Sequence, residues 1–342
     1  MSNQNHINRR SLLGAGGLVA ASTLGLGAAG MAASPARADI QGEPQRFEDQ
    51  GRFQSYLFNT TSISVQLPWQ APARATVLLP DGYHTSGKRY PVLYLLHGGL
   101  GDYLEFRRLN IEGLTAGKDI IVVMPEGGLA GWYSNPQRTS LTFGRRNWET
   151  FHMNELIPWV DATFRTHAEY SGRAVSGFSM GGFGALKYTA KYYGHFASVS
   201  SHSGPASLRR LEGLVAHYIN GTGVLDSGSL VYGFPWQEDL VSADNAVERI
   251  ESFRNKRIFL VAGTDRSPLF DGMINPPTTI DEELWSSVQE QQVMDGHREF
   301  GDLLDRAGIP HTRYEEPGGH FVRPHRLQED IEGILAHLKK AA

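Results

Sequence analysis

Short apolar runs alternate with longer amphipathic stretches along most of the chain. The apolar runs are closed by Gly, Pro or Asp and predict buried strands at 76–79, 91–96, 120–124, 173–176, 197–200 and 258–262. The amphipathic stretches repeat apolar residues every three or four positions and predict helices at 148–164, 180–193, 284–307 and 326–339. Strands that alternate with helices indicate an α/β fold, with a mostly parallel sheet covered by helices on both faces.

One segment, from about residue 205 to residue 255, interrupts this alternation. It mixes several glycines with aromatic residues, namely Tyr232, Phe234 and Trp236. We interpret it as an insertion over the carboxyl edge of the sheet and not as a second domain. A single catalytic domain is therefore expected at 57–342, preceded by a flexible lead-in at 39–56.

The first 38 residues predict an export signal. Arg9 and Arg10 precede a stretch rich in Ala and Gly, and no ionisable side chain follows until Arg37. Ala36 and Ala38 are the small residues that a signal peptidase requires, so cleavage is expected after Ala38. Paired arginines are typical of twin-arginine export to the cell envelope or the medium. The alternative is a retained membrane anchor, which this Gly-rich and Ala-rich stretch favours less.

The amino-acid composition limits the classes of function that the chain can have. The chain has 342 residues, of which 40% are hydrophobic, and a formal net charge of −4. No run of Lys and Arg is present to follow a phosphate backbone, so nucleic acid is not an expected partner. The sequence contains no cysteine, which excludes disulfides, thiolate metal sites and a cysteine nucleophile.

A candidate nucleophile lies in the sequence Gly177-Phe178-Ser179-Met180-Gly181. This G-x-S-x-G pattern joins the predicted strand at 173–176 to the helix that starts at Met180, as a nucleophile elbow requires. The turn is tight, so the positions two residues before and after Ser179 must lack bulky side chains. The alternative is a glycine-rich packing turn with an idle serine.

A serine hydroxyl attacks an ester only when a base takes its proton. His320 is the candidate base because it follows Gly318 and Gly319 in a loop after a further expected strand at 311–315. His325 is the rival, although its place before a helical pattern suits a capping or packing role better.

The acid that orients the base is expected between the serine and the histidine. Asp265 follows Gly263 and Thr264 at the end of the strand at 258–262, so its carboxylate is placed at the carboxyl edge of the sheet. It could instead cap a helix. Other acids are available further along, namely Asp271, Asp281, Glu282 and Glu283.

An oxyanion hole needs two backbone N–H donors. One is expected from Met180, the residue after the nucleophile. The other is expected from the loop His97-Gly98-Gly99-Leu100, which resembles the H-G-G loop of lipases and esterases. Gly99 is the first candidate and Leu100 the second, and the alternative is a turn that needs glycine only for its shape.

Substrate contacts are expected from large apolar side chains near this edge. Aromatic rings stack on sugars and pack on acyl chains. The candidates are Leu100, Trp132, Tyr133 and Trp236, with Tyr232 and Phe234 beside them. Ordinary core packing is the alternative role for the aromatic residues.

Together these motifs resemble the esterase D and antigen-85 family of α/β hydrolases, which includes feruloyl esterases, S-formylglutathione hydrolase and mycolyltransferases. The resemblance covers about residues 75–338, and it also rests on Trp148-Glu149-Thr150-Phe151 and Gly308-Ile309-Pro310. It implies an α/β-hydrolase fold, no metal or cofactor, and a triad of Ser179, Asp265 and His320. In the mycolyltransferase branch the acid is usually Glu, whereas Asp265 follows the esterase pattern.

We therefore expect an exported serine esterase or acyltransferase that works through an acyl-enzyme on Ser179. Its substrate is expected to be a small-molecule, lipid or sugar ester. A mycolyltransferase-type transfer to a sugar or glycerol is the alternative within this chemistry. A peptidase on the same fold and a catalytically silent binding protein are the rivals outside it.

Overall fold

The computed structural model describes residues 40–137, 139–210, 231–233, 237–264 and 280–342, and residues 37–342 group into one compact unit. The predicted export signal at 1–38 lies outside the described residues. So do Asp265, Asp271, Phe234 and Trp236.

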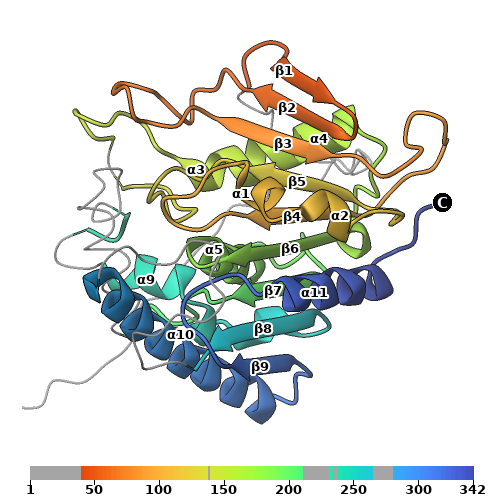
Figure 1. The fold of residues 1–342 in the computed structure, drawn as a ribbon. Coiled ribbons are helices and arrows are strands. Elements are labelled where there is room, and N and C mark those ends of the chain that lie inside the picture. Colours follow the sequence, from red (N-terminus) through yellow and green to blue (C-terminus); the bar gives the residue numbers. More distant parts are fainter. Residues whose placement is uncertain (1–39, 138, 211–230, 234–236, 265–279) are drawn as a thin grey trace, which may run out of the picture. The chain divides into compact units, whose positions relative to one another are not determined.

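Nine strands of the described chain form one sheet. From one edge to the other they are β1 (Gln45–Gln50), β2 (Phe53–Leu57), β3 (Arg74–Leu78), β5 (Ile121–Pro125), β4 (Val92–Leu96), β6 (Arg173–Phe178), β7 (Ser198–His202), β8 (Arg257–Gly263) and β9 (Thr312–Glu316). The strands from β5 to β9 in this order run parallel, and β1, β2 and β3 are antiparallel. Figure 1 shows the strands stacked in this order from top to bottom. All of the predicted strands are present.

The prediction of a flexible lead-in at 39–56 is wrong, because residues 45–50 form β1 and residues 53–56 form most of β2. β1 is an edge strand of mostly exposed polar residues, so it carries no apolar alternation. β2 buries Gln54 and Ser55, which are satisfied by the Tyr56 hydroxyl (2.7 Å) and by Thr76 Oγ1 (2.8 Å). Because these buried positions are polar, the strand has no apolar alternation that the sequence could show, and the sheet begins before residue 57.

Helices cover both faces of the sheet. One face carries α5 (Met180–Lys191) and a helix at 148–163 made of α3 (Trp148–Thr150), the π-helical segment η1 (Phe151–Leu156) and α4 (Ile157–Thr163). The other face carries α1 (Glu105–Arg108), α2 (Ile111–Leu114) and α11 (Pro324–His337), of which α2 and α11 lie in front in Figure 1. Within β4, Tyr94 and Leu96 point into the first core, and Leu93 and Leu95 point into the second. The predicted fold class is confirmed.

Two further helical regions bear on the site. α10 (Ile280–Arg306) packs against β8 and β9. The described part of the segment at 205–255 holds α9 (Glu238–Asp244) and the 3₁₀ turns η4 (Ala246–Glu248) and η5 (Ile250–Phe253), and α9 packs against α5. None of the described helices is both long and apolar enough to cross a bilayer.

Candidate active site

Ser179 lies in a strained turn between β6 and α5. Its φ is 53° and its ψ is −118°. A positive φ of this kind costs a non-glycine residue about 1–3 kcal/mol. The Ser179 amide donates to the carbonyl of His202 at the end of β7 at 2.8 Å, which attaches the turn to the neighbouring strand. A Cβ at Gly177 would overlap the backbone of Gly181, and one at Gly181 would overlap the carbonyl of Leu96. Both positions therefore require glycine, as a nucleophile elbow does.

The imidazole of His320 links the serine to a carboxylate. Its Nε2 lies 2.7 Å from the Ser179 hydroxyl, and its Nδ1 lies 2.6 Å from Oε2 of Glu290. His320 lies in the loop between β9 and α11, with its ring against that of Phe178. The rival His325 is largely exposed and pairs with Glu316 at 3.0 Å. The serine and the histidine singled out from the sequence are therefore in hydrogen-bond contact.

Glu290 is completely buried on the inner face of α10. Its Oε1 accepts hydrogen bonds from the Ser203 hydroxyl at 2.7 Å and from the Gly263 amide, and Arg323 Nη1 lies 4.0 Å away. Burial alone would raise the pKa of Glu290. The hydrogen bonds and charge of His320, the Gly263 amide and the Arg323 charge outweigh burial and hold this pKa below its ordinary value of 4.5.

Sequence reasoning missed Glu290 and gave its place to Asp265. Asp265 lies outside the described residues, as do the side chains of Asp281, Glu282 and Glu283. A signal for Glu290 was nevertheless present. It precedes Val293, Met294 and His297 by three, four and seven positions, so helical spacing puts a carboxylate on the buried stripe of α10.

The geometry of the oxyanion loop favours Gly99 over Leu100 as a donor. The Leu100 amide is already bonded to the carbonyl of Leu129 at 2.8 Å, so the second choice of donor is wrong. Among the described residues, the Gly99 amide has no such acceptor. Met180 is the first residue of α5, so its amide has no acceptor within the helix. These two amides remain the candidates for holding an oxyanion.

Two polar side chains, the buried His97 and the half-buried Glu105, fix the conformation of the oxyanion loop. The Gly98 amide donates to Glu105 Oε2 at 3.1 Å, and His97 Nδ1 lies 2.7 Å from the Gly98 carbonyl. The other ring nitrogen of His97, Nε2, accepts a hydrogen bond from the Gly127 amide at 2.8 Å. The loop is therefore fixed before any substrate arrives.

Two of the four residues predicted to contact substrate lie in the core. Tyr133 is completely buried and its hydroxyl donates to the His97 carbonyl at 2.9 Å, so its expected role in lining a pocket is wrong. Trp132 is 3% exposed and packs edge-on against Phe183, so its ring also belongs to the core. Leu100, within the oxyanion loop, is 69% exposed, and its contact with substrate stays a prediction. Trp236 lies outside the described residues.

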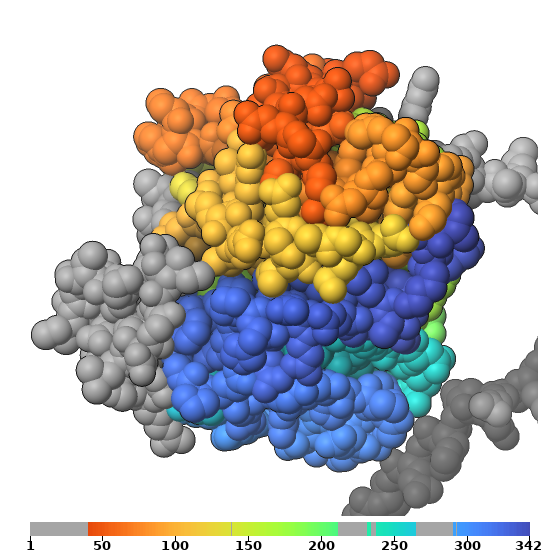
Figure 2. Space-filling view, turned by 45° about the vertical axis from the view of Figure 1, so that its right-hand side comes forward, coloured from red at the N-terminus to blue at the C-terminus, as the bar shows by residue number. Residues whose placement is uncertain are grey.

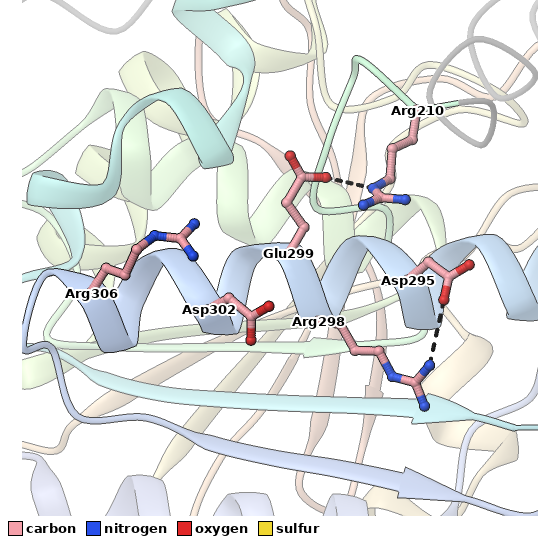
Figure 3. Close-up of a pocket in the computed structure, with 6 residues that line it drawn as sticks. All are labelled: Arg210, Asp295, Arg298, Glu299, Asp302 and Arg306. Carbon is pink, nitrogen blue, oxygen red and sulfur yellow. Dashed lines mark hydrogen bonds and ion pairs between the residues drawn. The ribbon is translucent and has the colours of Figure 1, made fainter.

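A hollow of about 530 Å³ lies on the outer face of α10 (Figure 3). The described side chains that line it are all charged: Arg210, Asp295, Arg298, Glu299, Asp302 and Arg306. Arg210 pairs with Glu299 at 2.5 Å, and Arg298 pairs with Asp295 at 3.6 Å. Such a surface does not suit an acyl group, and it lies on the face of α10 opposite Glu290.

Figure 2 shows the C-terminal part of the chain, in blue, from another side.

Among the described residues, no group of three His, Asp or Glu side chains is arranged to hold a metal ion. The arrangement of Ser179, His320 and Glu290 supports acyl transfer through a serine nucleophile, because each group contacts the next in the order that such chemistry needs.

Comparison with known proteins identifies the family. The model of the Esterase protein family matches residues 68–330, which is most of the chain. The chain belongs to the Esterase family. An esterase of Mycobacterium tuberculosis is 56% identical to this chain over 302 residues, which make up 87% of this chain and 62% of that protein. This member of the family therefore spans less than two thirds of the length of that relative.

Two solved structures share the fold of this Esterase-family chain. MPT51 of Mycobacterium tuberculosis matches with a TM-score of 0.61 at 18% identity, over 81% of this chain and 98% of that one. A fluorophosphonate-binding serine hydrolase of Staphylococcus aureus matches with a TM-score of 0.60 at 17% identity, over 84% and 98%. At these identities the likeness establishes the α/β-hydrolase fold. The resemblance to the esterase and antigen-85 family is confirmed at the level of the family.

Proposed function

We propose that this protein is a serine carboxylic-ester hydrolase that forms an acyl-enzyme on Ser179. The observation that carries the proposal is the continuous chain of contacts from the Ser179 hydroxyl through both nitrogens of His320 to Glu290. Membership of the Esterase family supports the same chemistry.

In the first step the Ser179 oxygen attacks the ester carbonyl carbon while His320 Nε2 takes the hydroxyl proton. The carbonyl oxygen becomes an oxyanion, which the amides of Met180 and Gly99 stabilise. The carbon–oxygen bond to the alcohol then breaks, and His320 returns the proton to the departing alkoxide. Throughout, Glu290 holds the Nδ1–H and stabilises the imidazolium.

In the second step water attacks the acyl carbon while His320 Nε2 takes a proton from it. The bond between the acyl carbon and Ser179 Oγ then breaks, His320 returns the proton to Oγ, and the acid is released. An alcohol in place of water would give a new ester, so transfer to a sugar or glycerol acceptor is the second candidate function. One observation favours it: the acid that the structure pairs with His320 is a glutamate, as the mycolyltransferase resemblance implies.

Location is a further part of the proposal. The paired Arg9 and Arg10 and the site after Ala38 support export and cleavage before residue 39. N-terminal sequencing of protein from the medium or envelope tests this, because the mature chain should begin at Asp39. Retention of the first residues would contradict it.

The central test compares the wild type with Ser179→Ala on p-nitrophenyl esters and with a fluorophosphonate probe. Loss of the nucleophile should lower turnover on the order of 10⁴–10⁶-fold and abolish labelling. His325→Ala is the matched control and should keep both activities. Near-normal hydrolysis by Ser179→Ala would refute the proposal.

The same assay separates hydrolysis from transfer. The wild type is incubated with a long-chain p-nitrophenyl ester, with and without glycerol or a disaccharide, and the products are analysed by mass spectrometry. Free acid in both cases supports the hydrolase, and an acylated acceptor supports the transferase. An amide substrate cleaved in preference to its ester would instead support a peptidase.

A further inference from the structure

Glu290 reaches the site from a helix and not from the end of a strand. It lies on α10, 27 residues after Gly263, the last residue of β8. A carboxylate at a strand end is placed by the sheet itself. A carboxylate on a separate helix is placed only by what that helix contacts, so the alignment of Glu290 with His320 depends on those contacts.

Ser203 makes such a contact. Its hydroxyl donates to Glu290 Oε1 at 2.7 Å, and both side chains are completely buried. Ser203 follows β7 with a φ of 54°, a conformation that a non-glycine residue adopts at a cost of about 1–2 kcal/mol. Its amide donates to the carbonyl of Val261 in β8 at 2.7 Å, which holds the turn in place. The strained backbone therefore aims one hydroxyl at one carboxylate oxygen.

A second contact fixes the same turn to the same helix. His297 Nε2 lies 2.8 Å from the carbonyl of Gly204, and His297 is two turns beyond Glu290 on the buried face of α10. The turn at 203–204 is therefore tied to α10 at two points along the helix. The charged or titratable described groups that face Glu290 are His320 and Arg323 from the loop before α11, and His297 from α10 itself.

We propose that Ser203 is a positioning residue for the triad, and that it acts by fixing the orientation of the Glu290 carboxylate. The inference rests on the proposed function and deepens it. The carboxylate has two oxygens, of which Oε2 meets His320 and Oε1 is held by Ser203 and the Gly263 amide. Without the Ser203 hydroxyl, the partners of Oε1 that remain in the described part of the chain are the Gly263 amide and Arg323, and rotation of the carboxylate would misalign its bond to Nδ1.

A double-mutant cycle tests this action through Glu290. Ser203→Ala is made in the wild type and in Glu290→Gln, and kcat and KM are measured on one p-nitrophenyl ester. In the wild-type background kcat should fall about tenfold, as for the loss of one hydrogen bond to a buried charge, with KM nearly unchanged. In the Glu290→Gln background the same substitution should change kcat by less than about twofold.

Two variants guard against a purely structural explanation. Ser200→Ala is the matched control, because its hydroxyl donates to the buried Asp330 at 2.6 Å and not to Glu290. It should lower the melting temperature and leave kcat close to the wild-type value. Ser203→Gly relieves the backbone strain and also lacks the hydroxyl, so it should fold and show the same loss of kcat as Ser203→Ala.

The outcomes are distinguishable. Equal losses from Ser203→Ala in both backgrounds, or an unchanged kcat in Ser203→Ala or Ser203→Gly, would overturn the positioning role while Ser179→Ala remains inactive. Active Ser179→Ala would instead refute the serine esterase itself.

Discussion

The buried carboxylate of Glu290 keeps its negative charge because its partners compensate for the water it has lost. A pKa below 4.5 means that Glu290 is ionised across the neutral range. In the proposed reaction His320 gains a proton in each step, and the fixed charge at Nδ1 would stabilise the resulting imidazolium. In this proposal Glu290, which was not singled out from the sequence, provides the charge that stabilises protonated His320.

Replacing Glu290 by Gln should separate it from Asp265 as the acid. The amide keeps the shape but loses the charge, so kcat should fall on the order of 10³–10⁴-fold with KM little changed. Asp265→Asn is the companion variant and should retain most of the activity. Steady-state kinetics of both variants on one ester distinguishes the two acids. A larger loss of kcat in Asp265→Asn would show that Asp265, and not Glu290, is the acid.

Local patterns predicted two of the three groups in this chain of contacts. Ser179 and His320 are each marked by neighbours in sequence, a glycine-flanked turn and a glycine loop. Glu290 has no such neighbours, because its role arises only when α10 packs against β8. What the sequence could not supply was the tertiary position of a helix.

At the scale of elements, the elbow depends on how closely α5 approaches β4. The carbonyl of Leu96 lies where a side chain at position 181 would be, so the helix can start here only with glycine at that position. The same strand ends in the oxyanion loop. A small displacement of α5 therefore moves the nucleophile and the Met180 amide relative to Gly99.

Gly181→Ala should consequently be damaging in two ways. The added methyl group must displace backbone, so the variant should melt at a lower temperature and its remaining folded fraction should be labelled far more slowly by a fluorophosphonate. Gly194→Ala is the control, because an added Cβ there meets no atom within 4 Å. Thermal melting and labelling rates are measured on both. Wild-type labelling by Gly181→Ala would contradict the close approach.

Elements without an apolar signature were the ones that sequence patterns missed. Polar side chains of β1 and β2 pair with one another and with β3. Such pairs give no alternation of apolar and polar residues within a single strand. The helix at 148–163 was predicted in extent, but its π-helical turn was not. There His152 bonds to Tyr188 at 2.9 Å and to the carbonyl of Glu126 at 2.7 Å, contacts that only the fold provides.

At the scale of the whole molecule, a buried ion network joins three segments that are distant in sequence. Lys187 of α5 is completely buried and lies 2.8 Å from Glu149 of α3 and 2.9 Å from Asp244 of α9. Lys191 contacts the same two carboxylates. The network ties α9, and with it the described part of the segment at 205–255, to the helix that follows the nucleophile. Breaking one member leaves the other charges buried without compensation.

Acid should weaken this network at a defined pH. Burial raises the pKa of Glu149, but the charges and hydrogen bonds of Lys187 and Lys191 overcome it and lower this pKa from 4.5 to about 2. A depressed pKa means that the stabilisation is fully present above about pH 4.5 and is lost as the pH falls towards about 2.

Glu149→Gln should therefore reduce the free energy of unfolding on the order of 3 kcal/mol near neutral pH, with the difference from the wild type shrinking below pH 4.5. Urea unfolding across this pH range measures it, with Glu251→Gln, which breaks only an exposed pair with Arg254, as the control. A difference that stays constant from neutral pH down to about pH 3 would contradict the prediction, because it would show that the contribution of Glu149 does not depend on its ionisation.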